Sequence, residues 1–372
     1  MALVGSCIEG KKLSVTGLGR ALLNTVYEKH NIKRADRLIG NAHLHKERKW
    51  IHAALARKVI CHHPAPVILI DWSPLSADGR FHLLRASLPV GGRALTLHDE
   101  VHPEKRLHNR KVEKRFLIHL QEIIPKPSRP IIVTDSGYRS PWFRAVLSMG
   151  WDFVGRVGGR TLVSSHAKND WGRIENITKT ATVRARYYGF IDLVKRSPVA
   201  CHAYLVKKAP QGRTKKTVHG KPCQSKHSKD NAHRERSPWF IVTSLEGGGA
   251  MTKPVMNLYK TRMQIEQGFR DIKNTRWGFS LEEAKVTMAC RYENLLLVGT
   301  LATFAVWLVG KIAEQKKIHR RYQANTIKTG AVLSTFYLGC RVLKKQAGEF
   351  KLADYKQALI ALQENFKAQC FG

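Results

Sequence analysis

The order of apolar segments between residues 65 and 157 restricts the folds open to this chain. Segments with the pattern of strands alternate there with segments that have the 3.6-residue period of helices. In chain order they are three strands, a helix, a strand, a helix and a strand: Val67–Asp71, Phe81–Leu88, Ala94–Val101, Glu104–Ile124, Ile131–Asp135, Ser140–Met149 and Trp151–Val157. The first run is apolar up to its last residue, as expected for a central strand that is buried on both faces. The order predicts an α/β fold.

This order of elements is that of the RNase-H-like fold, in which the first and fourth strands lie side by side. Asp71 ends the first of these strands and Asp135 ends the fourth, so the fold would bring the two carboxylates together. An isolated aspartate at a strand end is more often a cap or a turn residue, and a likeness of fold by itself only supports an expectation.

Further along the chain, a stripe of four functional side chains follows helical spacing. Its members are Tyr259, Arg262, Glu266 and Lys273. At about 100° per residue, their side chains fall within an arc of roughly 60°. Apolar residues line the adjoining face and would pack the helix against a core: Val255, Leu258, Ile265, Phe269 and Ile272. The spacing predicts one helix with a functional stripe, and a solvated helix face is the alternative.

Two aspartates at strand ends and one helical glutamate form a candidate metal site. Asp71, Asp135 and Glu266 could together hold two divalent cations for phosphoryl transfer, one activating the nucleophile and one supporting the leaving oxygen. Carboxylate oxygens are hard ligands, which favours Mg²⁺, with Mn²⁺ as a substitute. The cations Arg262 and Lys273 and the phenol Tyr259 could bind phosphates beside these metals.

The chain is strongly basic, with 64 Lys and Arg against 28 Asp and Glu and a net charge of +36. Such a protein is expected to bind a polyanion, and nucleic acid is favoured over a membrane surface. The first 62 residues have the pattern of a basic helical domain, whose candidate DNA contacts are Lys33, Arg34 and Arg37. A solvated basic helix face is the alternative interpretation.

A second concentration of cations lies in Lys207–Arg236, which has ten Lys and Arg and two acids among Gly, Pro and Ser. This composition predicts a basic loop that becomes ordered on phosphate, with Lys215 and Lys216 as candidate DNA contacts. The spacing of His219, Cys223, His227 and His233 in the same loop superficially resembles a zinc site. Without a supporting strand or helix, zinc is the weaker interpretation.

The stretch around this loop, residues 158–250, has strand-like runs without helical periodicity: Thr182–Tyr187, Phe190–Lys195, Cys201–Lys207 and Trp239–Ser244. They predict a β-rich insertion domain. Trp239 begins the last run and is either a core residue or a ring that stacks on an unpaired base. We therefore expect five segments: a helical DNA-binding domain at 1–62, the first part of the core at 63–157, the insertion domain at 158–250, the second part of the core at 251–315, and a helical dimerisation region at 316–372.

The cysteines and the apolar stretches of the sequence indicate the cellular compartment in which the protein is expected to work. The seven cysteines form no Cys-x-x-Cys pair, which indicates free thiols in a reducing cytoplasm. No signal peptide pattern is visible at the N-terminus. The uncharged stretch Asn294–Gly310 is at the short limit for a membrane span, and a buried core helix is the favoured interpretation. We expect a bacterial cytoplasmic protein that joins the nucleoid when bound to DNA and does not enter a membrane.

The motifs resemble those of the insertion-sequence-four family of bacterial DDE transposases. The spaced Tyr-Arg-Glu-Lys stripe is similar to the family signature, and further likenesses point to its transposon-Ten branch: His30-Asn-Ile-Lys-Arg-x-Asp-Arg-Leu, His43-Leu-His-Lys-Glu-Arg, Asp71-Trp-Ser, Leu84-Arg-Ala-Ser, Arg262-Met-Gln-Ile-Glu and Gln323-Ala-Asn-Thr. The resemblance extends over essentially the whole chain. It implies an RNase-H-like catalytic core interrupted by the β-rich insertion domain, with helical terminal regions.

The resemblance also implies roles for residues. Asp71, Asp135 and Glu266 match the catalytic triad, and Trp239 matches a residue that stacks on a base flipped out during end cleavage through a DNA hairpin. Tyr259, Arg262 and Lys273 match phosphate contacts. The implied activity is cut-and-paste transposition by a homodimer that binds double-stranded DNA, namely terminal inverted repeats and target.

One departure from the family keeps other functions open. Members of this branch have a further helical stretch before the segment near Leu13, so we expect a shortened DNA-binding domain here. A remnant that binds DNA without cutting it is therefore the alternative to an active transposase. A nuclease of the same fold without strand transfer is a third possibility. Retention of all three acids argues against the remnant.

Overall fold

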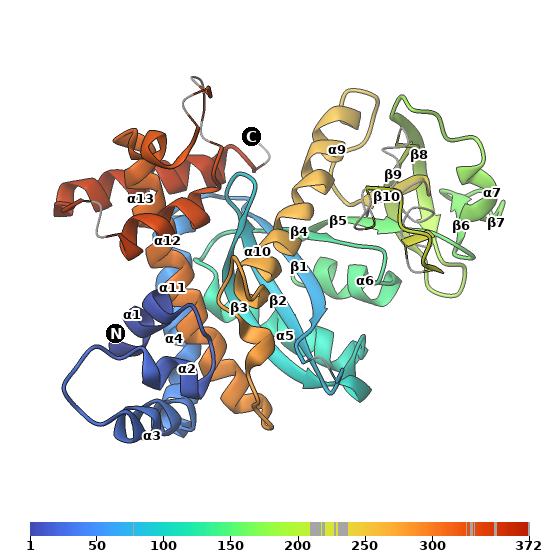
Figure 1. The fold of residues 1–372 in the computed structure, drawn as a ribbon. Helices are drawn as coiled ribbons and strands as arrows, with labels where there is room; N and C mark the ends of the chain where they lie inside the picture. The colour runs from blue at the N-terminus through green and yellow to red at the C-terminus, as the bar shows by residue number, and fades with distance from the viewer. Residues whose placement is uncertain are drawn as a thin grey trace. The chain divides into compact units, whose positions relative to one another are not determined.

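The computed structural model describes residues 1–76, 78–208, 217, 220–226, 228–229, 237–324, 326–327, 330, 332–345 and 348–370. The chain divides into two compact units, the first comprising Met1–Pro130 with Thr261–Gly372 and the second Ile131–Lys260 (Figure 1). The five segments expected from the sequence do not coincide with these units, because the N-terminal helices pack with the C-terminal ones. That five-part division stays a prediction.

The first unit contributes three antiparallel strands, with β2 between β1 and β3 (Figure 1). Their bounds are β1 (Val67–Pro74), β2 (Phe81–Pro89) and β3 (Ala94–Pro103). The register places Asp71 opposite Arg85, and Arg85 opposite Asp99. Asp71 therefore lies inside β1 and does not end it as expected, because the strand continues pairing with β2 as far as Pro74.

Because side chains alternate along a strand, the two faces of this sheet carry different residues. Asp71, Arg85 and Asp99 share one face, and α10 (Met263–Lys273) covers it: the guanidinium of Arg85 lies 5.4 Å from the ring centroid of Phe269. The opposite face carries Trp72 and meets α5 (Arg110–Ile123). Helix α5 starts later than expected, because Asn109 caps it after a short 3₁₀ turn, η1 (Glu104–Arg106).

Helices from both ends of the chain complete the first unit. The N-terminal ones are α1 (Ala2–Gly10), α2 (Val15–Arg20), α3 (Glu28–Ile39) and α4 (Ala42–Ile60), and the C-terminal ones are α11 (Ala289–Gln315), α12 (Thr335–Lys344) and α13 (Leu352–Lys367), with 3₁₀ turns η2 (Leu281–Glu283) and η3 (Ile318–Tyr322). Helix α11 packs against α1, α12, α13 and β3 (Figure 1). It is long and apolar enough to cross a membrane by composition alone, but 67% of its most apolar window is buried inside the protein. Burial of this kind is typical of a core helix.

The second unit contributes seven strands, of which β4 pairs parallel with β5 while the remaining pairs are antiparallel. Its strand order is β4-β5-β10-β9-β8-β6-β7. The bounds are β4 (Ile131–Thr134), α6 (Ser140–Ser148), β5 (Asp152–Val157), β6 (Leu162–Ser165), β7 (Gly172–Arg173), α7 (Ile174–Thr178), β8 (Arg186–Leu193), β9 (Val199–Val206), β10 (Trp239–Thr243) and α9 (Thr252–Thr261).

The sequence pattern misplaced several elements of this unit. The runs Thr182–Tyr187 and Phe190–Lys195 were expected to be two strands, but the structure has one, β8. An irregularity between Tyr187 and Gly189, where Gly189 has φ +146°, interrupts the alternation without ending the strand. Strands β6 and β7 and helix α7 were not anticipated. The loop that follows β9 lies mostly outside the described residues.

The functional stripe does not lie on one unbroken helix. Helix α9 ends at Thr261 and α10 begins at Met263, with Arg262 between them. Arg262 keeps helical dihedral angles, φ −49° and ψ −36°. The helical period of the sequence therefore continues from α9 into α10, and the break between the two helices cannot be seen in the sequence. Tyr259 consequently belongs to the second unit and Glu266 to the first.

Candidate active site

Two of the three predicted catalytic acids meet in the first unit. Asp71 comes from β1 and Glu266 from the first turn of α10, where a carboxylate is stabilised by the positive end of the helix dipole. Arg262 joins them: its Nη1 lies 2.7 Å from Oε1 of Glu266 and 3.8 Å from Oδ2 of Asp71. The two carboxylates thus converge on one cation, an arrangement that also suits a divalent metal ion with oxygen ligands.

Lys273, the last member of the stripe, lies on the same side of α10. Its ammonium donates hydrogen bonds to Oγ of Ser73, at 2.7 Å, and to the carbonyl of Pro74. Burial, followed by the positive charge of Arg85, lowers the pKa of Lys273 from 10.5 to about 8. The side chain is therefore still a cation near neutral pH, and it becomes neutral in mildly alkaline solution.

These residues line a cleft of about 460 Å³, formed by β1, α10 and the turn that follows α10. Its lining is mostly polar: Asp71, Trp72, Ser73, Glu266, Phe269, Arg270, Lys273, Asn274, Thr275 and Glu282. Gln264 fixes the start of α10 by accepting hydrogen bonds from the backbone N–H groups of Val90 and Gly91, both at 3.1 Å. The helix that carries Glu266 is thereby tied to the turn between β2 and β3.

Asp135 belongs to the second unit, where it directly follows β4. It accepts a hydrogen bond from the backbone N–H of Gly137 at 2.8 Å, which is the turn geometry expected of an aspartate in this position. The meeting of Asp135 with Asp71 and Glu266 stays a prediction.

Trp239 and Tyr259 pack against each other in the second unit. Their ring centroids are 4.9 Å apart in an edge-to-face arrangement, and both side chains are buried. The ammonium of Lys208 lies 4.1 Å from the centroid of the Trp239 ring, a cation–π distance. Trp239 is thus a packed residue with a cation over its ring, and its predicted role in base stacking requires Lys208 to move away.

The predicted DNA contacts of the N-terminal region are accessible. Lys33, Arg34 and Arg37 are exposed on α3, as direct contact with phosphates would require. Lys215 and Lys216 lie outside the described residues, as does most of the loop that contains them. Both sets stay predictions.

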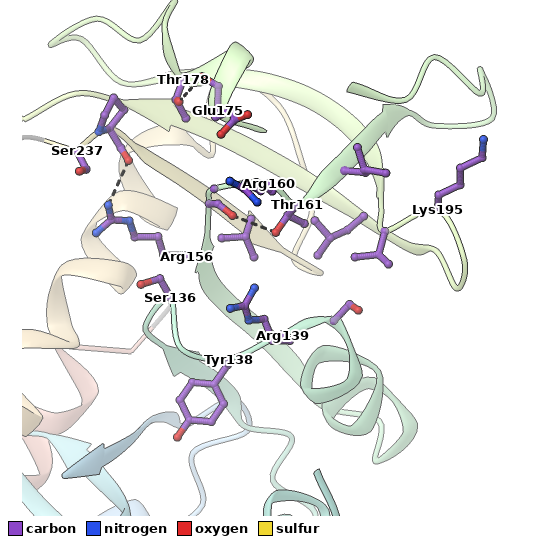
Figure 2. Close-up of a pocket in the computed structure, with 18 of the residues that line it drawn as sticks. Ser136, Tyr138, Arg139, Arg156, Arg160, Thr161, Glu175, Thr178, Lys195 and Ser237 are labelled. Carbon is purple, nitrogen blue, oxygen red and sulfur yellow. Dashed lines mark hydrogen bonds between the residues drawn. The ribbon is translucent and has the colours of Figure 1, made fainter. Parts of the chain in front are cut away.

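A basic cleft in the second unit was not anticipated from the sequence. It has a volume of about 1030 Å³ and opens beside the segment that follows Asp135. Five cations and one acid are among its lining residues: Arg139, Arg156, Arg160, Lys195, Arg196 and Glu175. Figure 2 shows Arg139 and Arg156 near the loop that carries Ser136, and Arg160 on the turn after β5.

The cations of this cleft are available for a ligand. Arg156 donates to the carbonyl of Pro238 at 3.3 Å, a contact drawn in Figure 2. Among the described residues, none of the five cations forms an ion pair with a carboxylate. Their positions along the sequence are irregular because the start of α6, strand β5 and the turns after β5 and β8 all contribute to the cleft, so no periodic signal could have revealed them.

A buried ion pair supports the catalytic face of the first unit. Arg85 donates from Nε and Nη2 to the two carboxylate oxygens of Asp99, at 2.6 and 2.9 Å, and both side chains are almost fully buried. Arg85 is also the cross-strand neighbour of Asp71. The ion pair with Asp99 therefore directs the buried guanidinium towards Asp99 and not towards Asp71. The register of three strands creates this contact, and the sequence alone does not show it.

Comparison with known proteins identifies the family. Residues 62–283, well over half of the chain, match the family described as Transposase DDE domain. None of the curated proteins matches this chain. A solved structure, the cryo-EM structure of the piggyBac transposase synaptic complex with hairpin DNA, is 11% identical with a TM-score of 0.44, over 100% of this chain and 74% of that one. The match to residues 62–283 contains Asp71, Asp135 and Glu266, and on its strength the chain belongs to the DDE transposase family, whose members are metal-dependent DNA phosphoryl transferases.

Proposed function

We propose that this protein is a cut-and-paste transposase of the transposon-Ten branch of the insertion-sequence-four family, with an RNase-H-like core and a β-rich insertion. One observation carries the proposal: Asp71 and Glu266, distant in sequence, converge on Arg262 and line one polar cleft. Asp135 is the third acid of the triad.

The chemistry requires charge compensation at the scissile phosphate. Mg²⁺, or Mn²⁺ in its place, would be held by Asp71, Asp135 and Glu266, and when bound it neutralises the phosphate and lowers the pKa of the attacking hydroxyl. Arg262 now compensates Glu266 and Asp71. With metal ions bound to these acids, the guanidinium of Arg262 would be able to bind a phosphate oxygen of the DNA, and Lys273 would contribute a second positive charge from the same side of α10.

The proposed reaction proceeds in four phosphoryl transfers at each transposon end. Water first breaks one phosphodiester bond and leaves a 3′-hydroxyl on the transposon strand. That hydroxyl then attacks the opposite strand, so that a hairpin forms and the flanking DNA leaves with its own 3′-hydroxyl. Hydrolysis reopens the hairpin, and the regenerated 3′-hydroxyl joins to target DNA. Trp239 would stack on the base expelled by the hairpin bend, a step in which stacking returns about 1–3 kcal/mol.

The basic surfaces are proposed to position the DNA. The exposed cations of α3 would contact the terminal inverted repeat, and the basic cleft beside Asp135 would bind the backbone near the cleavage point. We propose a homodimer holding two ends in the bacterial cytoplasm.

The test is cleavage of a duplex that carries the element's own inverted repeat. Asp71→Asn, Asp135→Asn and Glu266→Gln should each abolish Mg²⁺-dependent nicking and leave DNA binding near the level of the unmodified protein. The matched control is Glu122→Gln, which removes an exposed carboxylate whose partner is Lys49. A triad variant that cuts at the normal rate would remove that residue from the site.

The same assay separates the alternative functions. A protein that binds the end and never nicks it is the DNA-binding remnant. A protein that nicks, but does not join the freed 3′-hydroxyl to target DNA, is a nuclease of the same fold. Full excision followed by joining supports the transposase.

A further inference from the structure

A cluster of histidines surrounds one glutamate on the α5 side of the first unit's sheet. Oε1 of Glu100 lies 2.7 Å from Nδ1 of His119 and 3.2 Å from Nε2 of His98. Oε2 of the same carboxylate lies 3.0 Å from Nε2 of His102. Three imidazoles from β3 and α5 therefore direct ring nitrogens at a single carboxylate.

The cluster is largely withdrawn from water. His98, Glu100 and His102 are buried, and His119 is the accessible member, with 43% of its side chain exposed. Behind His98 lies His52 of α4, fully buried, with the two rings edge to face at 5.8 Å. Neither ring nitrogen of His52 has a hydrogen-bond partner within the described part of the chain, nor has Nδ1 of His98. Buried polar nitrogens without hydrogen-bond partners are unfavourable. Packing alone therefore does not explain why these histidines are grouped here.

The spacing of the ligand atoms suits a small metal ion. One donor atom from each of His98, Glu100 and His119 lies within 4.8 Å of the others. In a tetrahedral site with bonds of about 2.0–2.1 Å, ligand atoms are roughly 3.3 Å apart. Nε2 of His98 already has this spacing from Oε1 of Glu100, at 3.2 Å, whereas Nδ1 of His119, at 2.7 Å, would move outward when an ion binds. Two imidazoles and one carboxylate are typical zinc ligands, whereas Mg²⁺ prefers oxygen ligands in an octahedron.

We propose that His98, Glu100 and His119 bind one Zn²⁺ ion, separate from the metal ions of the catalytic acids. His102, which contacts the other carboxylate oxygen, would hold Glu100 in orientation, as hydrogen-bond partners of metal ligands commonly do. The exposed His119 provides the route of entry and leaves room for water as the fourth ligand.

The position of the site indicates a structural role. The ion would join β3, through His98 and Glu100, to α5, through His119. The ring of His102 meets that of Trp72 at 5.6 Å, and Trp72 is adjacent to Asp71 on β1. The site therefore supports the strand that carries a catalytic acid from the face opposite the cleft. This proposal does not depend on strand transfer or on hairpin formation.

The experiment is Zn²⁺ titration of the full-length protein in excess Mg²⁺, which occupies the oxygen ligands of the catalytic cleft. Isothermal calorimetry gives the stoichiometry, and the absorption spectrum of the Co²⁺-substituted protein distinguishes nitrogen and oxygen ligands from thiolates. We expect one ion per chain with no thiolate band. His119→Ala should weaken binding by about tenfold or more, and Zn²⁺ should raise the melting temperature of the unmodified protein but not of this variant.

Two control variants make the test specific. His166→Ala removes a similarly exposed histidine, 2.9 Å from the carboxylate of Asp192, and should bind Zn²⁺ normally. Cys223→Ser removes the thiol of the loop and should also bind normally. Circular dichroism checks that His119→Ala is folded, and because this side chain is half exposed its loss should leave the helix intact. Absence of Zn²⁺ binding, equal binding by His119→Ala, or loss of binding in Cys223→Ser would each overturn the proposal.

Discussion

Replacement of Asp99 by Asn tests how the catalytic face of the first unit is held together. In the native protein Asp99 accepts two parallel hydrogen bonds from Arg85, and the exposed fractions of the two side chains are 1% and 3%. The amide keeps the size of the carboxylate and removes its charge, so a buried guanidinium would be left without an anionic partner. Its cross-strand neighbour on the other side is Asp71, to which it would then be drawn.

The magnitude follows from burial. Removing one partner of a buried ion pair destabilises a protein by about 3–5 kcal/mol, because the remaining charge stays desolvated. For a unit of this size, a loss of 1 kcal/mol lowers the melting temperature by about 2–4 °C. We therefore expect the melting transition of the first unit to fall by about 6–20 °C. Catalysis should fall as well, since Arg85 would compete for Asp71.

Thermal and urea unfolding, followed by circular dichroism, provide the assay. Glu122→Gln serves as the exposed comparison, since a surface pair contributes about 0–1 kcal/mol. The double variant Arg85→Met with Asp99→Leu removes both charges and should recover most of the stability. A loss below about 1 kcal/mol for Asp99→Asn, or a double variant as unstable as the single one, would refute the reasoning.

Three further outcomes are expected. Because burial lowers the pKa of Lys273 to about 8, its side chain is a cation below that pH and neutral above it, so kcat/KM for end cleavage should fall above pH 8. Lys273→Arg should extend activity to higher pH. Identical pH–rate profiles for the two proteins would contradict this role of Lys273. Replacing Arg139 and Arg160 by Ala should reduce the slope of log affinity against log salt by about two, at roughly 0.9 per phosphate contact, and an unchanged slope would remove the cleft from the DNA interface. Trp239→Ala should nick the first strand normally but form or resolve hairpins slowly. An abasic site at the expelled position should partly rescue this variant, because ejecting a base costs a few kcal/mol. If gel analysis shows equal loss of nicking and of hairpin processing, Trp239 is a core residue only.

The sequence by itself determined the local elements and the type of chemistry. Periodicity is a local property, so strands such as Ile131–Thr134 and helices such as Ser140–Ser148 were predicted close to their observed bounds. The acids stood out because acids are scarce in so basic a chain. Where one residue interrupts a pattern without changing its period, as at Arg262, the sequence could not show the break.

Only the tertiary structure decided which side chains meet. Arg85 faces Asp99 because two strands pair in one register, and His119 reaches Glu100 because α5 packs across β3. Each contact depends on the packing of segments that are separate in sequence. A shift of one residue in register would turn every side chain of a strand to the opposite face. The histidine cluster and the basic cleft therefore result from strand register and packing. The residues capable of metal-dependent phosphoryl transfer, in contrast, can be identified from the sequence.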